Sequence, residues 1–354
     1  MSAHISRAGQ WLLQSGIQES NGGVARYYRA DLQRNHAVSI EITGYAASAF
    51  AYLHALTGEQ AYLAAAVRSA RFLARTAWDP GGRILPFELD PPAYSYFFDC
   101  GIVVRGLLAV WRAARDGEFL EAAVRIGESM ALHFAPVNGE IHPILQLPGK
   151  TPALRDALRW STCPGCYQLK SAMAWWDLAE ATREFRFREP YERALESALA
   201  TYGGFLPGQP DPLKVMDRLH PFLYFLEGLL PRAADKRCAT AICGGIPRAA
   251  AFLREIAPRF VRSDVYAQLL RIRLLADRAG IAPLDRDAAE YEAGQAARFQ
   301  AVSADPRVHG GFYFGRKGED WLPYVNPVST AFCLQALAMW GHGGGTAFSL
   351  SDLV

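Results

Sequence analysis

The feature that most constrains this sequence is a helix-turn-helix unit that recurs along the chain. The first copy covers 41–74, where an apolar helix is joined by the turn Thr57-Gly58-Glu59 to a second helix with a single apolar stripe. Elements of this copy return at 117–125 and, more weakly, at 182–187. A recurring unit points to one architecture, because each copy must bury its apolar face against its neighbours.

Helices of two kinds alternate along the chain. The more apolar kind is expected to form an inner ring, at 41–57, 99–115, 164–182, 218–231, 263–279 and 326–341. The amphipathic kind is expected outside, at 3–16, 60–77, 118–134, 188–202, 234–257 and 285–300, with a break at Pro247. This arrangement predicts that the following inner-helix residues are buried: Ile42, Phe50, Leu53, Leu107, Val110, Met173, Leu226, Leu270 and Leu334.

The opening hairpin resembles a known superfamily. The stretch Glu41-Ile42-Thr43-Gly44-Tyr45, the Thr57-Gly58-Glu59 turn and the start Tyr62-Leu63 are similar to uncharacterised and glucuronyl-C5-epimerase-like members of the six-hairpin glycosidase-like superfamily. With six inner and six outer helices, the resemblance covers nearly the whole chain and implies an all-α fold, the (α/α)6 toroid. That superfamily contains glycoside hydrolases, polysaccharide lyases and sugar epimerases, with the site in a funnel at the loop-bearing end. The resemblance implies this location only.

Composition limits the domain count and the class of partner. The even spread of apolar residues over 354 residues favours one domain at 1–342, followed by a tail at 343–354. Lys and Arg number 37 against 35 Asp and Glu, so the net charge is small and neither nucleic acid nor a membrane is expected as partner. The expected ligand is a small molecule or an oligosaccharide. The oligomeric state stays open. The start of the chain shows no signal peptide and the cysteines are sparse, which predicts a cytoplasmic protein.

The long connections indicate where a ligand would bind. They are 17–40, 78–98, 135–162, 203–217 and 301–325, and they all lead into the N-termini of inner helices. Long connections in a compact fold usually carry function. The positive ends of the inner helices therefore gather around one concavity, which favours anionic or polyhydroxy ligands.

Candidate site residues stand at these helix starts. Acid–base chemistry on a sugar needs two groups that flank one bond, commonly carboxyl groups with different pKa values. Glu41 and Asp99 open neighbouring inner helices and are expected to share the rim of the funnel, and His220 is the third catalytic candidate. The expected substrate-binding residues are Arg34, His36, Tyr45, Tyr94, Trp160, Tyr224, Asp264 and Asn326.

Each of these candidates also has a purely structural interpretation. Asp99, Asp264 and Asn326 stand where residues that cap helix N-termini usually stand. Glu41 is equally consistent with a first-turn carboxylate that interacts with the helix dipole, and His220 with a hydrogen-bonded structural histidine.

Two further pairs of residues are interpreted as structural. Cys163-Pro-Gly-Cys166 is expected to form the turn before the third inner helix, the alternative being a zinc site with His220 as a third ligand. Glu227 and Arg271 lie deep in apolar helices and are expected to pair, because buried charges need partners. No metal and no cofactor are therefore expected.

The expected function is a saccharide-acting enzyme, a hydrolase, lyase or epimerase that uses carboxylate acid–base catalysis in the funnel. The alternative is a non-catalytic toroid that binds a glycan or serves as a scaffold. The lumen of the inner ring distinguishes the two. A ring-sized cleft with two carboxyl groups supports the enzyme, whereas a lumen plugged by side chains supports the scaffold.

Overall fold

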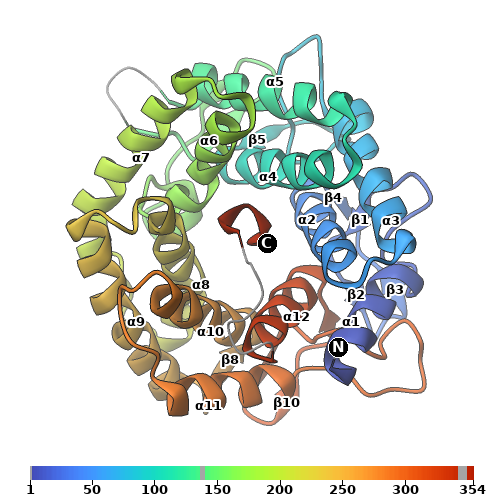
Figure 1. Ribbon diagram of the computed structural model, residues 1–354, viewed down its shortest axis with the longest axis vertical. Helices are drawn as coiled ribbons and strands as arrows, with labels where there is room; N and C mark the ends of the chain where they lie inside the picture. The colour runs from blue at the N-terminus through green and yellow to red at the C-terminus, as the bar shows by residue number, and fades with distance from the viewer. Residues whose placement is uncertain (1, 136–139, 342–348) are drawn as a thin grey trace.

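The computed structural model describes residues 2–135, 140–341 and 349–354, and in these ranges the helices form two concentric rings (Figure 1). The inner ring contains α2 (Ile40–Thr57), α4 (Phe97–Ala114), α6 (Gln168–Thr182), α8 (Pro212–Leu229), α10 (Ser263–Arg278) and α12 (Pro327–Gly341). The outer ring contains α1 (Ala3–Gln14), α3 (Gln60–Arg71), α5 (Gly117–His133), α7 (Arg188–Thr201), α9 (Lys236–Ile256) and α11 (Arg286–Ala297). Each inner helix contacts the next, and α12 contacts α2, so the ring is closed. The predicted (α/α)6 toroid is confirmed.

Short strands hold the inner helices at their N-terminal ends. β4 (Val38–Ser39), β5 (Tyr94–Tyr96), β8 (Phe260–Arg262) and β11 (Tyr324–Val325) run directly into α2, α4, α10 and α12. The other strands are β1 (Val24–Ala25), β2 (Tyr28–Arg29), β3 (Arg34–Asn35), β6 (Ile144–Gln146), β7 (Thr151–Pro152), β9 (Gly315–Lys317) and β10 (Asp320–Trp321). They pair antiparallel in the orders β1-β4, β11-β2-β3, β5-β6-β7 and β10-β9-β8. These pairings tie the long connections together at one end of the ring.

Single-turn helices complete the list of elements. η1 (Phe72–Ala77) is a π-helix that continues α3, and the rest are 3₁₀ turns: η2 (Trp160–Thr162), η3 (Phe185–Phe187), η4 (Tyr202–Gly204), η5 (Leu230–Arg232) and η6 (Leu350–Asp352). No helix in the described part of the chain is long and apolar enough to cross a membrane.

Local chemistry explains the first hairpin. The Ser39 hydroxyl accepts a hydrogen bond from the backbone N–H of Ile42 and so caps α2. Gly58 ends the helix with a φ of 75°, a left-handed conformation that glycine adopts at little cost. Arg115 and Arg183 take the same left-handed position at the ends of α4 and α6. The turn geometry therefore repeats even where its glycine does not.

Glycines also let the inner helices approach one another closely. A Cβ atom on Gly106 of α4 would lie 2.5 Å from the carbonyl oxygen of Gly44 on α2. A Cβ atom on Gly101 would clash with the backbone of Ser171 on α6. Real Cβ atoms do not make such contacts, so the packing of α4 between its neighbours requires glycine at both positions.

The burial prediction is confirmed, but two predicted helix starts and the predicted break at Pro247 are wrong. All nine residues expected in the core are buried. α6 begins at Gln168 because the Cys163–Cys166 segment forms the turn before it, and α8 begins at Pro212, where the Asp211 side chain caps the helix. α9 continues through Pro247 because the residues around this proline, among them Ile246 and Ala250, are buried, so tertiary packing outweighs the lost backbone hydrogen bond.

Part of the lumen is filled by a buried ionic cluster. Glu227 of α8 accepts a hydrogen bond from Lys170 Nζ at 2.9 Å and another from Arg271 Nη2 at 2.6 Å. All three side chains have no exposed surface. The expected pairing of Glu227 with Arg271 is confirmed, and Lys170 is an additional partner.

Residues 349–354, expected as part of a tail, lie inside the ring beside this cluster (Figure 1). Lys170 and Arg271 both donate to the carbonyl oxygen of Val354, each at 3.2 Å. The Gln335 side chain donates to Asp352 O at 2.7 Å and accepts from Val354 N at 3.1 Å. Side chains from several inner helices thus bind the backbone of this segment and hold it inside the ring.

Replacing Glu227 by glutamine should destabilise the fold strongly. The substitution leaves two buried cations without their anion, and breaking a buried pair in this way usually costs about 3–5 kcal/mol. The matched control is Glu196→Gln, which breaks the exposed pair with Arg237 and should cost less than about 1 kcal/mol. Urea denaturation measures both values. Equal, small losses in the two variants would show that the cluster does not support the lumen.

Candidate active site

A cavity of about 180 Å³ opens at the N-terminal ends of α2, α4 and α6, beside the middle of α8. Its walls are formed by Glu41, Phe87, Tyr96, Phe98, Asp99, Pro143, Trp160, Ser161, Tyr167, Gln168, His220 and Tyr224. The structure thus brings together five of the residues proposed from the sequence: Glu41, Asp99, His220, Trp160 and Tyr224. They come from three helices and one loop.

Two carboxyl groups stand side by side in the cavity wall. Glu41 is in the first turn of α2 and Asp99 in the first turn of α4, and neither side chain caps its helix. Burial raises the pKa of Glu41 to about 7, and the nearby positive charge of Arg26 opposes this rise. Burial also raises the pKa of Asp99 well above its usual value, and the charge of Glu41 raises it further. The two groups therefore do not both ionise readily near neutral pH.

Asp99 carries an unused hydrogen-bonding atom. Its Oδ2 is buried and makes no hydrogen bond within the described ranges. A buried polar atom without a partner is uncommon in native proteins and usually has a functional explanation. Asp99 belongs to the cavity wall, so its carboxyl group is a candidate partner for a bound ligand.

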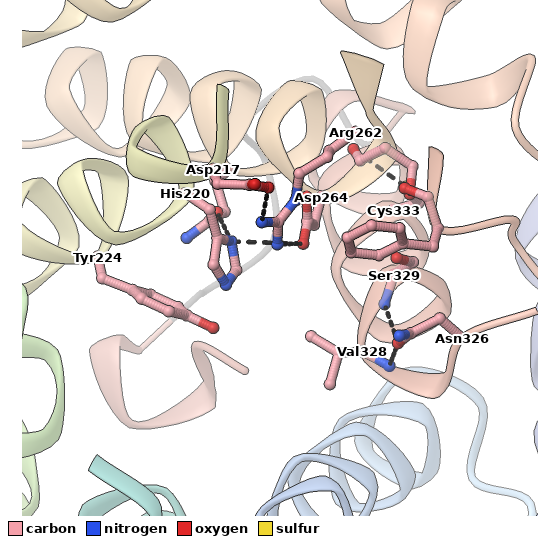
Figure 2. A network of polar contacts seen from close by, with 12 residues as sticks. Asp217, His220, Tyr224, Arg262, Asp264, Asn326, Val328, Ser329 and Cys333 are labelled. Atoms are coloured by element: carbon pink, nitrogen blue, oxygen red, sulfur yellow. Dashed lines mark hydrogen bonds and ion pairs between the residues drawn. The ribbon is translucent and has the colours of Figure 1, made fainter. Parts of the chain in front are cut away.

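His220 faces the same cavity from α8. Its Nδ1 lies 2.6 Å from Gln268 Oε1 and 3.4 Å from Asp264 Oδ2 (Figure 2). Burial lowers the pKa of His220 to about 4, although the Asp264 carboxylate acts in the opposite direction. The imidazole is therefore neutral near pH 7 and can accept a proton.

Three of the proposed binding residues lie behind the wall. Tyr45 is buried and donates a hydrogen bond to the Tyr224 hydroxyl at 2.6 Å. Asp264 is buried in a two-bond ion pair with Arg262, so its carboxylate neither caps α10 nor reaches the cavity (Figure 2). Asn326 caps α12, because its Oδ1 accepts from the backbone N–H groups of Val328 and Ser329. The capping interpretation is thus right for Asn326 and wrong for Asp99 and Asp264.

Arg34, His36 and Tyr94 do not belong to the cavity wall. Arg34 is exposed on β3, and His36 is exposed and packs against Tyr27 in a tilted arrangement with ring centroids 4.7 Å apart. Tyr94 is 42% exposed at the far end of β5 from α4, whereas Tyr96, two residues nearer the helix, lines the cavity. Sequence distance from the helix start was too coarse a guide for these loop residues.

Several wall residues were missed by the sequence analysis. Tyr167 stands directly before α6, and the misplaced start of that helix hid its position at the helix end. Phe87 and Pro143 come from long connections and carry no sequence signal that sets them apart.

The described ranges assemble no metal site. No three His, Cys, Asp or Glu side chains in them come together as ligands, so the zinc alternative with Cys163, Cys166 and His220 is not formed there. Cys166 is buried, and the Cys163 thiol donates to the carbonyl oxygen of Asp156.

Solved structures with the same fold act on sugars, according to their descriptions. The chain is similar to the cellobiose 2-epimerase of Spirochaeta thermophila DSM 6192, with a TM-score of 0.72, 15% identity and 96% of each chain covered. It is similar to a D-mannose isomerase, with a TM-score of 0.69, 11% identity, and 95% of this chain and 96% of that chain covered. It is also similar to an unsaturated glucuronyl hydrolase specific for heparin, with a TM-score of 0.69, 11% identity and 96% of each chain covered.

These similarities establish the fold, the six-hairpin toroid that the sequence predicted. No protein-family model matches the sequence, and no curated protein matches it by sequence comparison.

The raised pKa of Glu41 predicts a characteristic pH dependence of stability. Between about pH 4.5 and 7 the folded chain keeps a proton on Glu41 that the unfolded chain releases, so ionising this group opposes folding as the pH rises. Glu41→Gln removes this unfavourable ionisation from the folded state. The variant should therefore gain stability relative to the wild type between pH 5 and 8, by about 1–3 kcal/mol.

Urea denaturation at several pH values measures this difference. The control is Glu121→Gln on the exposed face of α5, which should differ from the wild type by the same amount at every pH. A constant difference for Glu41→Gln as well would show that Glu41 titrates normally.

Proposed function

We propose that the cavity is the active site of a saccharide-acting enzyme that uses Glu41, Asp99 and His220 for acid–base catalysis. The observation that carries the proposal is the meeting of two carboxyl groups with raised pKa values and one neutral imidazole in a single cavity. Clustered titratable groups with perturbed pKa values in a cleft are typical of catalytic sites.

The carboxyl pair is suited to hold one proton. Ionisation of Glu41 makes ionisation of Asp99 harder, so above about pH 7, where Glu41 ionises first, the pair contains one carboxylate and one carboxylic acid. A saccharide reaction by acid–base catalysis needs a proton donor and a proton acceptor at once. The pair, with His220 as a second acceptor, supplies both.

Aromatic side chains support a sugar as the ligand. Phe87, Tyr96, Trp160 and Tyr167 contribute flat, largely apolar surfaces to the same wall. Such surfaces stack on the C–H face of a sugar ring, while the carboxyl and imidazole groups can bind its hydroxyls. The structural neighbours described as a cellobiose epimerase, a mannose isomerase and a glucuronyl hydrolase support the same class of ligand.

His220 favours proton transfer, and hence an epimerase or isomerase, among the reactions open to this site. A neutral imidazole beside an acidic pair suits the removal and return of a proton. Hydrolysis and elimination use the same donor and acceptor and remain the other outcomes of an activity screen.

All six cysteines are free thiols, which supports our proposal of a reducing, cytoplasmic location.

The filled lumen gives the non-catalytic alternative one supporting observation. Residues 349–354 and the Glu227 cluster plug the lumen, as expected for a scaffold. A cavity nevertheless opens at the N-terminal ends of α2, α4 and α6, and its wall contains the two carboxyl groups. The enzyme is therefore the better supported of the two functions.

Saccharide binding should be detectable by thermal shift. A ligand at 100 times its Kd stabilises the native state by about 2.7 kcal/mol. We expect mono- or disaccharides to raise Tm of the wild type and to raise Tm of Trp160→Ala much less, because the variant lacks an aromatic wall. A full shift with the Trp160 variant would place the ligand elsewhere.

Turnover should depend on the carboxyl pair. With a saccharide that binds, Glu41→Gln and Asp99→Asn should each lower kcat by at least about 100-fold without a loss of Tm, since the amides keep the side-chain volume. The matched control is Glu121→Gln on the exposed face of α5, which removes a carboxyl group that does not line the cavity. Loss of kcat in the control, or normal kcat in both cavity variants, would contradict the proposal.

A further inference from the structure

We infer that Asp264 and Gln268 are positioning residues that hold His220 with its proton on Nδ1, so that Nε2 is left as a proton acceptor. The catalytic meaning of this inference rests on the proposed function, but the tautomer itself does not. The evidence is the set of groups that surround Nδ1 of the imidazole: Gln268, and Asp264 with its partner Arg262, which Figure 2 shows beside His220.

Both atoms that face Nδ1 are acceptors. Gln268 Oε1 is 2.6 Å away and Asp264 Oδ2 is 3.4 Å away. A carbonyl oxygen and a carboxylate oxygen can only accept, so Nδ1 must supply the hydrogen. In a neutral imidazole the other nitrogen then has a free lone pair. Nε2 makes no hydrogen bond to the described part of the chain.

Arg262 keeps Asp264 in its ionised form. Its Nε and Nη2 donate to the two carboxylate oxygens of Asp264, at 3.0 and 2.6 Å, and the guanidinium carbon lies 4.6 Å from the centre of the Phe314 ring. Asp217 binds the remaining side of the guanidinium at 3.2 Å. A carboxylate held by two hydrogen bonds to arginine stays unprotonated and fixed in orientation. Asp264 can therefore act only as an acceptor toward His220.

The opposite orientation of the Gln268 amide is disfavoured. It would place an NH2 group against Nδ1, which would move the imidazole proton to Nε2. The bare Nδ1 would then face the Asp264 carboxylate at 3.4 Å, with two acceptors in contact. The repulsion between them is strong in a buried site, where Asp264 is only 4% exposed.

The arrangement assigns a direction to proton transfer. With Nδ1 committed to Gln268 and Asp264, the imidazole can take a proton from a ligand at Nε2 but cannot give one from its neutral form. The proton donor must then be the Glu41–Asp99 pair. When Nε2 is protonated, the Asp264 carboxylate lies beside the imidazolium and stabilises its charge.

Nitrogen NMR of the full chain with ¹⁵N-labelled histidine tests the tautomer directly. The chain has eight histidines, and the His220 signals are identified by their loss in His220→Asn. At neutral pH we expect a protonated Nδ1 and an unprotonated Nε2. A protonated Nε2, or a rapid average of the two tautomers, would overturn the inference.

Two variants test which residues set the tautomer. Gln268→Leu removes the closer acceptor, and Asp264→Asn replaces the carboxylate by an amide that can also donate, so each should raise the fraction of the Nε2–H form, whereas Gln268→Glu keeps an acceptor oxygen and should keep the proton on Nδ1. Asp31→Asn is the matched control, because Arg29 binds Asp31 through the same two nitrogens and the same two-residue spacing, but on the surface. If Asp264→Asn does not fold, Gln268→Leu alone decides the question. Unchanged signals in every folded variant would contradict a positioning role.

Activity distinguishes positioning from mere structural support. Where a saccharide is turned over, Gln268→Leu should lower kcat by about 10-fold or more with a smaller effect on KM, and Gln268→Glu should recover most of the loss. Loss of Tm with unchanged kcat would show a structural role only. If His220 has the predicted tautomer but the protein turns over no saccharide, this inference holds and the proposed function is refuted.

Discussion

Buried charge in the lumen is the constraint on which the rest of the structure depends. A closed ring of six helices encloses a space that must be filled, and charges placed there need partners. Glu227 lies between Lys170 and Arg271, and the two cations find a further acceptor in the Val354 carbonyl. This cluster and residues 349–354 fill part of the lumen, and the cavity lined by Glu41 and Asp99 lies at the N-terminal ends of the inner helices.

The same ring therefore holds acidic groups in two opposite environments. The Arg271 and Lys170 cations hold the pKa of Glu227 below its usual value despite complete burial. Glu41 and Asp99 make no ion pair, burial raises the pKa of both, and the charge of Glu41 raises that of Asp99 further, so they keep a proton at a pH where Glu227 has lost it. The contrast shows that the cavity carboxyl groups do not neutralise a buried cation. They are suited instead to exchange a proton with a ligand.

The fold was largely predictable because its signals are periodic and repeated. Apolar inner helices and amphipathic outer helices occur in turn, and residues such as Phe50 and Met173 follow from that pattern alone. The convergence of Glu41 and Asp99 followed from one further rule, that equivalent helix starts meet at one end of a closed ring, whereas His220 joins them from the middle of α8.

What the sequence could not predict depends on contacts between distant segments. Nothing in Leu353 or Val354 indicates that they occupy the lumen, because their partners lie on α6, α10 and α12. Asp264 has the sequence context of a capping or binding residue, and only the position of His220 on the neighbouring helix α8 makes it a support for that imidazole. Loop residues such as Tyr94 and Tyr96 differ in the structure but not in any sequence pattern.

The central claim is that the cavity lined by Glu41, Asp99 and His220 binds a saccharide. A crystal structure of the protein with the sugar that gives the largest thermal shift tests it most directly. The account predicts a sugar ring against Trp160, with its hydroxyls within hydrogen-bonding distance of Glu41, Asp99 and His220. A sugar bound only elsewhere, for example in the outer groove lined by Arg254, Tyr266 and Tyr291, would contradict it.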